Sequence, residues 1–314
     1  MAMADRSEPN SVGVSCLGNT MPFEVLLDYL AHFTRTMKDR TFFTYAWFTD
    51  ITHDVFKNAG YADAPFHRLL LWLLDTGVLN RTVLVFLRDL GFRMGGVRST
   101  FMGKLEDRQP FAFIAFPPRF LRAHPEAASS LRVNQWRLTT HFDVHATLVE
   151  LLDYPRRESL NTTHGLSLLH QVPETRTCAD ASIGKSFCVC NVIPYAVKQT
   201  LAASLTNYLL STINTLVQQA TRHCSQYRRL EIIDVMSLQP TAAERARNVS
   251  HYSVTVKVSP GEVVFEGAAR VQGNEISEVG DVSRCDEYSR LSYSVHTRWL
   301  RRACHCRRTV WDVA

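Results

Sequence analysis

The 314-residue sequence lacks several features that would assign it to a class at once. No stretch approaches the roughly 18 consecutive apolar residues of a membrane-spanning helix, and the first twenty residues have no apolar core of a secretory signal peptide. There is no P-loop, no dinucleotide-binding glycine fingerprint and no serine-hydrolase elbow. The formal charge of +5 is small for this length. The sequence therefore predicts neither a membrane span nor a nucleic-acid partner, and it identifies no other partner.

The composition is that of a globular protein. Apolar residues make up 46% and charged residues 21% of the chain, which is too apolar and too balanced in charge for an intrinsically disordered protein. The length is sufficient for about two domains. We find no internal repeat and no low-complexity segment.

Cysteine is unevenly distributed. Seven of the eight cysteines lie in the C-terminal half: Cys178, Cys188, Cys190, Cys224, Cys285, Cys304 and Cys306. An even number clustered in this way indicates disulfides and an oxidising compartment. Structural zinc is the competing interpretation, but neither C-x-C sequence has the C-x-x-C companion that zinc sites favour. The pairing cannot be predicted from the spacing, except that neither C-x-C is expected to close on itself.

Glycosylation sequons point to the same compartment. Asn161 and Asn248 are candidate acceptors, and Asn80 also begins a sequon. We therefore expect an extracellular protein, or one of the secretory pathway. Because an exported chain would carry a signal, we also expect that this chain begins downstream of its natural start.

The hydrophobic pattern of the first half alternates between helix and strand. A helix is predicted over 22–37, a buried strand over 41–48, and a second helix over 65–75, which starts with proline. The continuous apolar runs 82–87 and 111–116 are typical of strands covered on both faces. This order predicts an α/β protein with a parallel sheet.

The second half has a different pattern. A long apolar stripe predicts an amphipathic helix over 194–222. Residues 252–258 and 263–271 alternate with a period of two around a Ser-Pro-Gly turn, which predicts an antiparallel hairpin. We place an α/β domain at 1–192, and at 193–314 the long helix with a small cysteine-containing, β-rich domain.

The loop that follows the strand 82–87 is the first candidate site. Ligands of open parallel sheets bind outside the carboxyl ends of the strands. Asp89 lies at that position with two arginines and three glycines nearby. An ordinary turn, with Asp89 as its cap and the arginines in solvent, explains the same residues.

Two further clusters contain histidine. His53 stands next to acidic residues just after the predicted strand 41–48, where it suits either a metal or phosphate site or a capped helix start. His141 and His145 have the i, i+4 spacing of a helical zinc site, but neither is followed by a glutamate. Asp143, which lies between them, is better placed to cap a helix that runs past Leu148.

Several motifs, taken in order, resemble a known family. They are Asn80–Phe86, Asp89-x-Gly91-x-Arg93-x-Gly95, Arg98–Glu106, Asn134-Gln135, Phe142–Leu148, Gly165–Leu168, Arg176-Thr-Cys178, Cys188-Val-Cys190, Ser283-Arg284 and Cys304-His-Cys306. Together they resemble a domain-of-unknown-function family of the sulfatase and alkaline-phosphatase-like superfamily that is abundant in nematodes and arthropods. The resemblance implies a doubly wound α/β sheet. In active relatives it implies a Ser, Thr or Cys-derived nucleophile and divalent zinc, calcium or magnesium.

The sequence departs from the family at its metal site. The motif after the central strand reads Ser-Asp-His-Gly in the family, with Asp and His as metal ligands, but Arg88, Asp89, Leu90 and Gly91 stand here. Leu90 has no lone pair, and Arg88 places a positive charge beside the remaining carboxylate. The family's nucleophile segment is absent from this chain.

The resemblance therefore leaves Asp89 as a vestigial metal ligand, with His53 and Arg93 as vestigial active-site residues. We expect no intact catalytic set, no bound cofactor, and a truncated, inactive extracellular protein on a hydrolase-like scaffold. One alternative is a metal-dependent phosphate- or sulfate-ester hydrolase when the chain is complete. Another is a disulfide-stabilised structural or interaction protein.

Overall fold

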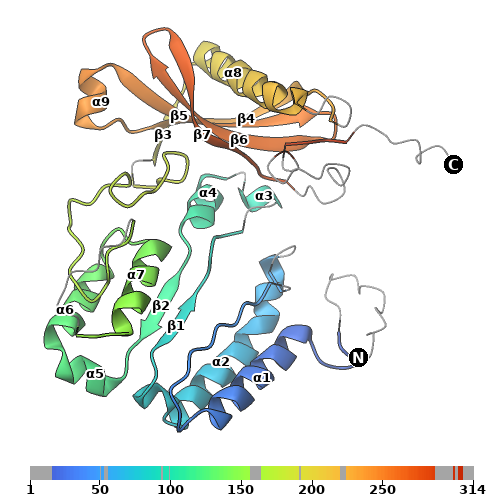
Figure 1. Ribbon diagram of the computed structural model, residues 1–314. Coiled ribbons are helices and arrows are strands. Elements are labelled where there is room, and N and C mark those ends of the chain that lie inside the picture. Colours follow the sequence, from blue (N-terminus) through green and yellow to red (C-terminus); the bar gives the residue numbers. More distant parts are fainter. Residues whose placement is uncertain are drawn as a thin grey trace. The chain divides into compact units, whose positions relative to one another are not determined.

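The chain is seen as a computed structural model (Figure 1), and its secondary structure is of the mixed α/β type that the sequence predicts. The structure describes residues 16–49, 51–52, 56–92, 95–98, 100–155, 164–190, 192–219, 224–286, 300 and 303–306. None of the helices in this part of the chain is long and apolar enough to cross a membrane.

The chain groups into two compact units that alternate along the sequence. The first comprises Met1–Phe92, Pro110–Gln135 and Leu168–Gln171, and the second comprises Arg93–Gln109, Trp136–Ser167 and Val172–Ala314. The division into domains at 192/193 stays a prediction.

Two helices form the apolar core of the first unit. They are α1 (Pro22–Thr36) and α2 (Ala59–Asp75), and Phe23 and Leu27 of α1 are buried together with Ile51. Helix α1 confirms the prediction over 22–37. Helix α2 begins at Ala59, earlier than predicted, so Pro65 lies inside the helix and not at its start. Two short 3-10 turns, Phe56–Asn58 and Val78–Asn80, lie before and after α2.

The predicted buried strand at 41–48 is wrong. These residues form no strand, and Phe43, Tyr45 and Trp47 are exposed. The segment contacts α2 through Phe48, whose ring packs edge-on against that of Phe66, with centroids 4.9 Å apart. Aromatic residues are enriched in strands because they pack well on a pleated surface, but their presence alone does not make a segment pair as a strand.

The next two predicted strands exist, but their predicted pairing is wrong. Strand β1 (Leu84–Leu87) pairs with β2 (Ala112–Ala115) in an antiparallel register, with Leu84 opposite Ala115. The prediction that both strands are covered on both faces is also wrong, since β1 is half-buried and Ala112, Phe113 and Ala115 of β2 are exposed. An unbroken apolar run carries no information about strand direction. Helices α5 (Pro118–Ala123) and α6 (Pro125–Asn134) follow in the same unit.

The second unit is built on a five-stranded antiparallel sheet of order β3-β4-β5-β6-β7. Its strands are β3 (Val192–Ala196), β4 (Arg228–Leu238), β5 (Val249–Ser259), β6 (Val263–Gln272) and β7 (Glu275–Arg284). Hairpin β5–β6 confirms the predicted hairpin, with Val258 opposite Val263. The predicted 194–222 helix starts later, as α8 (Gln199–Gln218), because β3 occupies the residues before it.

Helix α8 lies along one face of this sheet (Figure 1). Its apolar stripe of Leu205, Leu209, Ile213 and Val217 is buried with Phe265 and the inward-facing valines of β5 and β6. The helix approaches the sheet closely at Gly267, where a Cβ would lie 2.6 Å from Leu209 Cδ1. The described part of the unit also contains the helices α3 (Gly95–Arg98), α4 (Phe101–Arg108), α7 (His141–Leu151) and α9 (Ala242–Ala246).

Candidate functional site

The loop after β1 places Asp89 at the end of a strand, as the sequence predicts. The N–H of Arg88 donates to Phe111 O at 3.1 Å and extends the pairing of β1 with β2 by one residue. Asp89 is exposed, and its Oδ1 accepts the N–H of Leu90 at 3.0 Å. Its carboxylate therefore stabilises its own turn, which is the ordinary interpretation of this loop.

The other residues predicted for this site cannot be placed beside it. His53 and Arg93 lie outside the described residues, as does the candidate acceptor Asn161. Among the described residues, the metal-ligating atom types of Cys178, Cys188 and Cys190 come together, although Cys178 and Cys188 form a disulfide, and no such group of three includes Asp89.

The third predicted cluster lies at the start of α7 and is structural. Asp143 is the third residue of the helix, and its Oδ2 accepts the N–H of the N-cap residue Thr140 at 2.7 Å. His141 and His145 are both exposed, and neither belongs to a group of three metal-ligating side chains among the described residues. The structure thus supports the capping role of Asp143.

Asp143 also holds a buried arginine. The Asp143 side chain is 0% exposed and accepts hydrogen bonds from Arg176 Nη1 at 2.8 Å and Nη2 at 3.0 Å. The N–H of Leu166 donates to Asp143 Oδ1 at 2.7 Å. Both carboxylate oxygens are therefore saturated by donors from three separate segments. A saturated carboxylate is suited to fixing loops together and not to binding a ligand.

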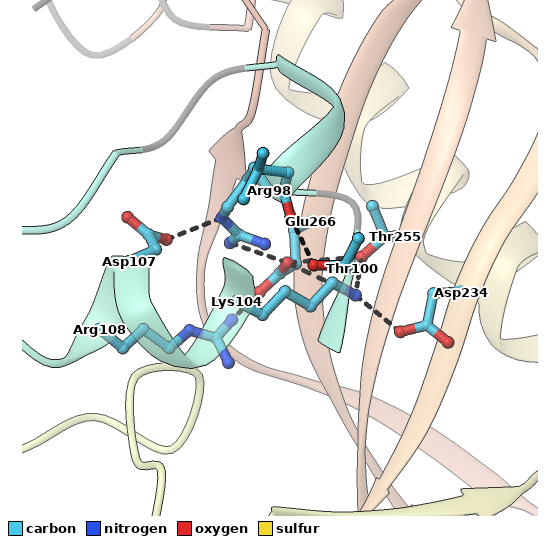
Figure 2. A network of polar contacts seen from close by, with 9 residues as sticks. Arg98, Thr100, Lys104, Asp107, Arg108, Asp234, Thr255 and Glu266 are labelled. Atoms are coloured by element: carbon cyan, nitrogen blue, oxygen red, sulfur yellow. Dashed lines mark hydrogen bonds and ion pairs between the residues drawn. The ribbon is translucent and has the colours of Figure 1, made fainter. Parts of the chain in front are cut away.

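A second set of buried charges joins α3 and α4 to the sheet, and we call it the buried ion network (Figure 2). It consists of Arg98, Lys104, Asp107, Arg108, Asp234, Thr255 and Glu266. Three cations face three carboxylates, so the network is balanced in formal charge.

Glu266 of β6 is the centre of this network. It is 4% exposed, accepts Arg98 Nη2 at 3.0 Å and pairs with Arg108. Lys104, 1% exposed, donates from Nζ to Asp234 at 2.7 Å and to the Thr255 hydroxyl at 2.9 Å. Figure 2 shows these side chains pointing toward one another between α4 and the strands.

Burial shifts the pKa values of the network in the expected directions. Burial lowers the pKa of Lys104, against the opposing hydrogen bond to Asp234. Burial and the charge of Arg98 lower the pKa of Arg108 to about 10. Burial also raises the pKa of the neighbouring Cys285 thiol, which is therefore protonated at pH 7. With a pKa of about 10, Arg108 stays charged at neutral pH, where its ion pair with Glu266 stabilises it.

Sequence reasoning missed this network, although one signal was present. Glu266 is a single acidic residue inside the apolar run of β6, and an isolated buried carboxylate needs a partner. The spacing of Arg98, Lys104 and Arg108 does not identify that partner, which lies 168 residues from Arg98.

Gly103 permits the close contact between α3 and α4 that orients the network. A Cβ at this position would lie 1.9 Å from Val97 O, a backbone atom that cannot move aside alone. We expect Gly103→Ala to lower the free energy of unfolding by about 3 kcal/mol, because overpacking of this kind forces a backbone shift. Urea denaturation followed by circular dichroism measures the change.

Gly60 of α2 is the matched control. A Cβ there meets nothing within 4 Å. Gly60→Ala should raise stability by up to about 1 kcal/mol, since alanine favours a helix more than glycine does. If Gly103→Ala raised the free energy of unfolding or left it unchanged, the assigned contact between Gly103 and Val97 would be contradicted.

Two disulfides lie within the second unit. Cys178 pairs with Cys188, and Cys224 pairs with Cys304 with a Cα–Cα distance of 5.2 Å. Neither C-x-C closes on itself, as predicted. The Cys224–Cys304 disulfide is buried in the core of α8 and the sheet, where the Tyr227 hydroxyl donates to Ala303 O at 3.0 Å.

An ion pair connects the Cys178–Cys188 loop to α9 and β5. Lys185 in the loop pairs with Glu244, and His251 Nε2 lies 3.1 Å from Glu244 Oε1. Burial alone would raise the pKa of Glu244, but hydrogen bonds from Lys185 and Thr241 outweigh it and lower the pKa to about 2. Burial and the charge of Lys185 lower the pKa of His251, so its ring is neutral at pH 7.

These features define a mixed α/β protein whose second unit is an antiparallel sheet stabilised by buried ion pairs and a core disulfide. The chain belongs to the family described as "protein of unknown function (DUF229)", whose model matches residues 1–233. Neither the curated proteins nor the solved structures contain a match to this chain.

Proposed function

We propose that this chain is a non-catalytic, exported member of its family. In this proposal it belongs to the sulfatase and alkaline-phosphatase-like superfamily, and the α/β scaffold serves as an extracellular or cell-surface binding module in place of a hydrolase.

The observation that carries the proposal is the environment of Asp89. Its neighbours are Arg88, a fixed cation, and Leu90, which offers no ligand atom where the resemblance expects histidine. Asp89 Oδ1 already accepts a hydrogen bond from its own turn. A divalent cation bound here would gain one carboxylate and meet one positive charge, which disfavours binding.

Export is supported by two features. The two disulfides are compatible with an oxidising compartment. The candidate acceptor Asn248 is exposed, in a left-handed turn (φ 53°) directly before β5, where a glycan would meet solvent.

Calorimetric titration with zinc, calcium and magnesium tests the proposal at this residue. We expect the wild type and the Asp89→Asn variant to give the same heats, because Asp89 holds no metal. Asp39→Asn, at another exposed aspartate, is the matched control. Binding of one equivalent that Asp89→Asn abolishes and Asp39→Asn retains would refute the proposal.

A further inference from the structure

Three sulfur atoms meet at the end of the loop 178–190. Cys178 and Cys188 form a disulfide, with Cα atoms 6.0 Å apart and a sequence separation of 10. Cys190 carries an exposed free thiol. The three Sγ atoms all lie within 4.8 Å of one another. A solvent-accessible thiol is thus held beside a disulfide that it could attack.

We propose that Cys178, Cys188 and Cys190 form a thiol–disulfide exchange site. The Cys190 thiolate attacks Cys178 Sγ, and a Cys178–Cys190 bond forms as the Cys178–Cys188 bond breaks. The electron pair of the broken bond stays on Cys188 Sγ, which takes up the proton that Cys190 released. One disulfide and one thiol are present before and after, so the step needs no external oxidant.

The two disulfide isomers, Cys178–Cys188 and Cys178–Cys190, close loops of similar length and so have a similar entropic cost. Cys178 is shared by both disulfides, and the second closes a loop only two residues longer than the first. Loop-closure entropy grows slowly with loop length, so it hardly distinguishes the two. The third possible pairing, Cys188 with Cys190, would have to close over a single residue.

The exchange would alter the loop 178–190, which contacts α9 through an ion pair. Lys185, three residues before Cys188, pairs with Glu244, the residue that His251 also contacts. Release of Cys188 changes the end of the loop that positions Lys185. It also makes Cys188, in place of Cys190, the thiol open to other thiols and disulfides in solution.

Disulfide mapping of the full chain tests the proposal. The protein is held at pH 8 with a chelator, quenched with acid, labelled with N-ethylmaleimide and digested without reduction. Because Val189 alone separates the two cysteines, fragment spectra must locate each label. We expect label on both Cys190 and Cys188, in proportions unchanged by tenfold dilution, as required for an intramolecular step. Label on Cys190 and none on Cys188 would overturn the proposal.

Two variants give a second, independent measurement. In Cys188→Ser, we expect a Cys178–Cys190 disulfide, with labelling of Cys190 falling to near zero. In Cys16→Ser, the matched control at a free thiol outside the cluster, the distribution should equal that of the wild type. A folded Cys188→Ser protein in which Cys178 and Cys190 are both fully labelled would refute the exchange. If that variant does not fold by circular dichroism, the wild-type mapping decides alone.

Discussion

Loss of the Cys224–Cys304 disulfide should lower the free energy of unfolding by about 4 to 5 kcal/mol. The bond spans a sequence separation of 80 residues, and such a cross-link removes a large amount of conformational entropy from the unfolded chain. Both cysteines also lie in the core with α8, so Cys224→Ala with Cys304→Ala loses packing as well. Urea denaturation of the double variant under non-reducing conditions gives the change.

The Cys178–Cys188 disulfide provides the control for this result. Its separation is 10 residues, for which chain entropy predicts a loss of about 2.5 to 3 kcal/mol in the double alanine variant. Removal of the Cys224–Cys304 disulfide should therefore lower the free energy of unfolding more than removal of the Cys178–Cys188 disulfide. If the two double variants lose equal stability, or the shorter cross-link matters more, the structural role assigned to the core disulfide is wrong.

Glu266→Gln should be nearly as damaging, with a loss of about 3 to 5 kcal/mol. The substitution keeps the shape of the side chain and removes the charge that Arg98 and Arg108 share in the buried ion network. Two guanidinium groups would then remain buried with less compensation. The stability of the variant, measured by urea denaturation at pH 7, reports this cost.

Glu262→Gln is the matched control in the same hairpin. The Glu262 side chain is 74% exposed and pairs with Lys257 at 2.5 Å, and a surface pair of this kind contributes at most about 1 kcal/mol. Adding Arg108→Met to Glu266→Gln should restore part of the lost stability, because it removes one of the uncompensated cations. A Glu266→Gln effect no larger than that of Glu262→Gln would show that the network contributes nothing.

Periodic segments were predictable from the sequence, and pairing partners were not. Helices α1 and α8 and hairpin β5–β6 follow from apolar spacing, which local sequence carries in full. The direction of β1 against β2 does not, because an apolar run reads the same in either orientation. Phe43, Tyr45 and Trp47 misled the strand prediction, because aromatic residues are enriched in strands but here lie exposed on a segment that forms no strand.

The candidate site shows the same limit. The position of Asp89 at a strand end and the cap formed by Asp143 could be predicted from the sequence, because each depends on a few adjacent residues. The partner of Asp143, Arg176, is 33 residues away, and the contact between Lys104 and Asp234 spans 130 residues. Contacts over such distances arise from the tertiary fold, which one sequence does not specify by spacing alone.

Metal content and turnover of the purified chain, measured together, test most directly the proposal that this family member is not a hydrolase. We expect no stoichiometric zinc, calcium or magnesium by elemental analysis, and no hydrolysis of aryl phosphates or aryl sulfates when these metals are supplied. One tightly bound metal ion per chain together with turnover that Asp89→Asn abolishes would contradict it.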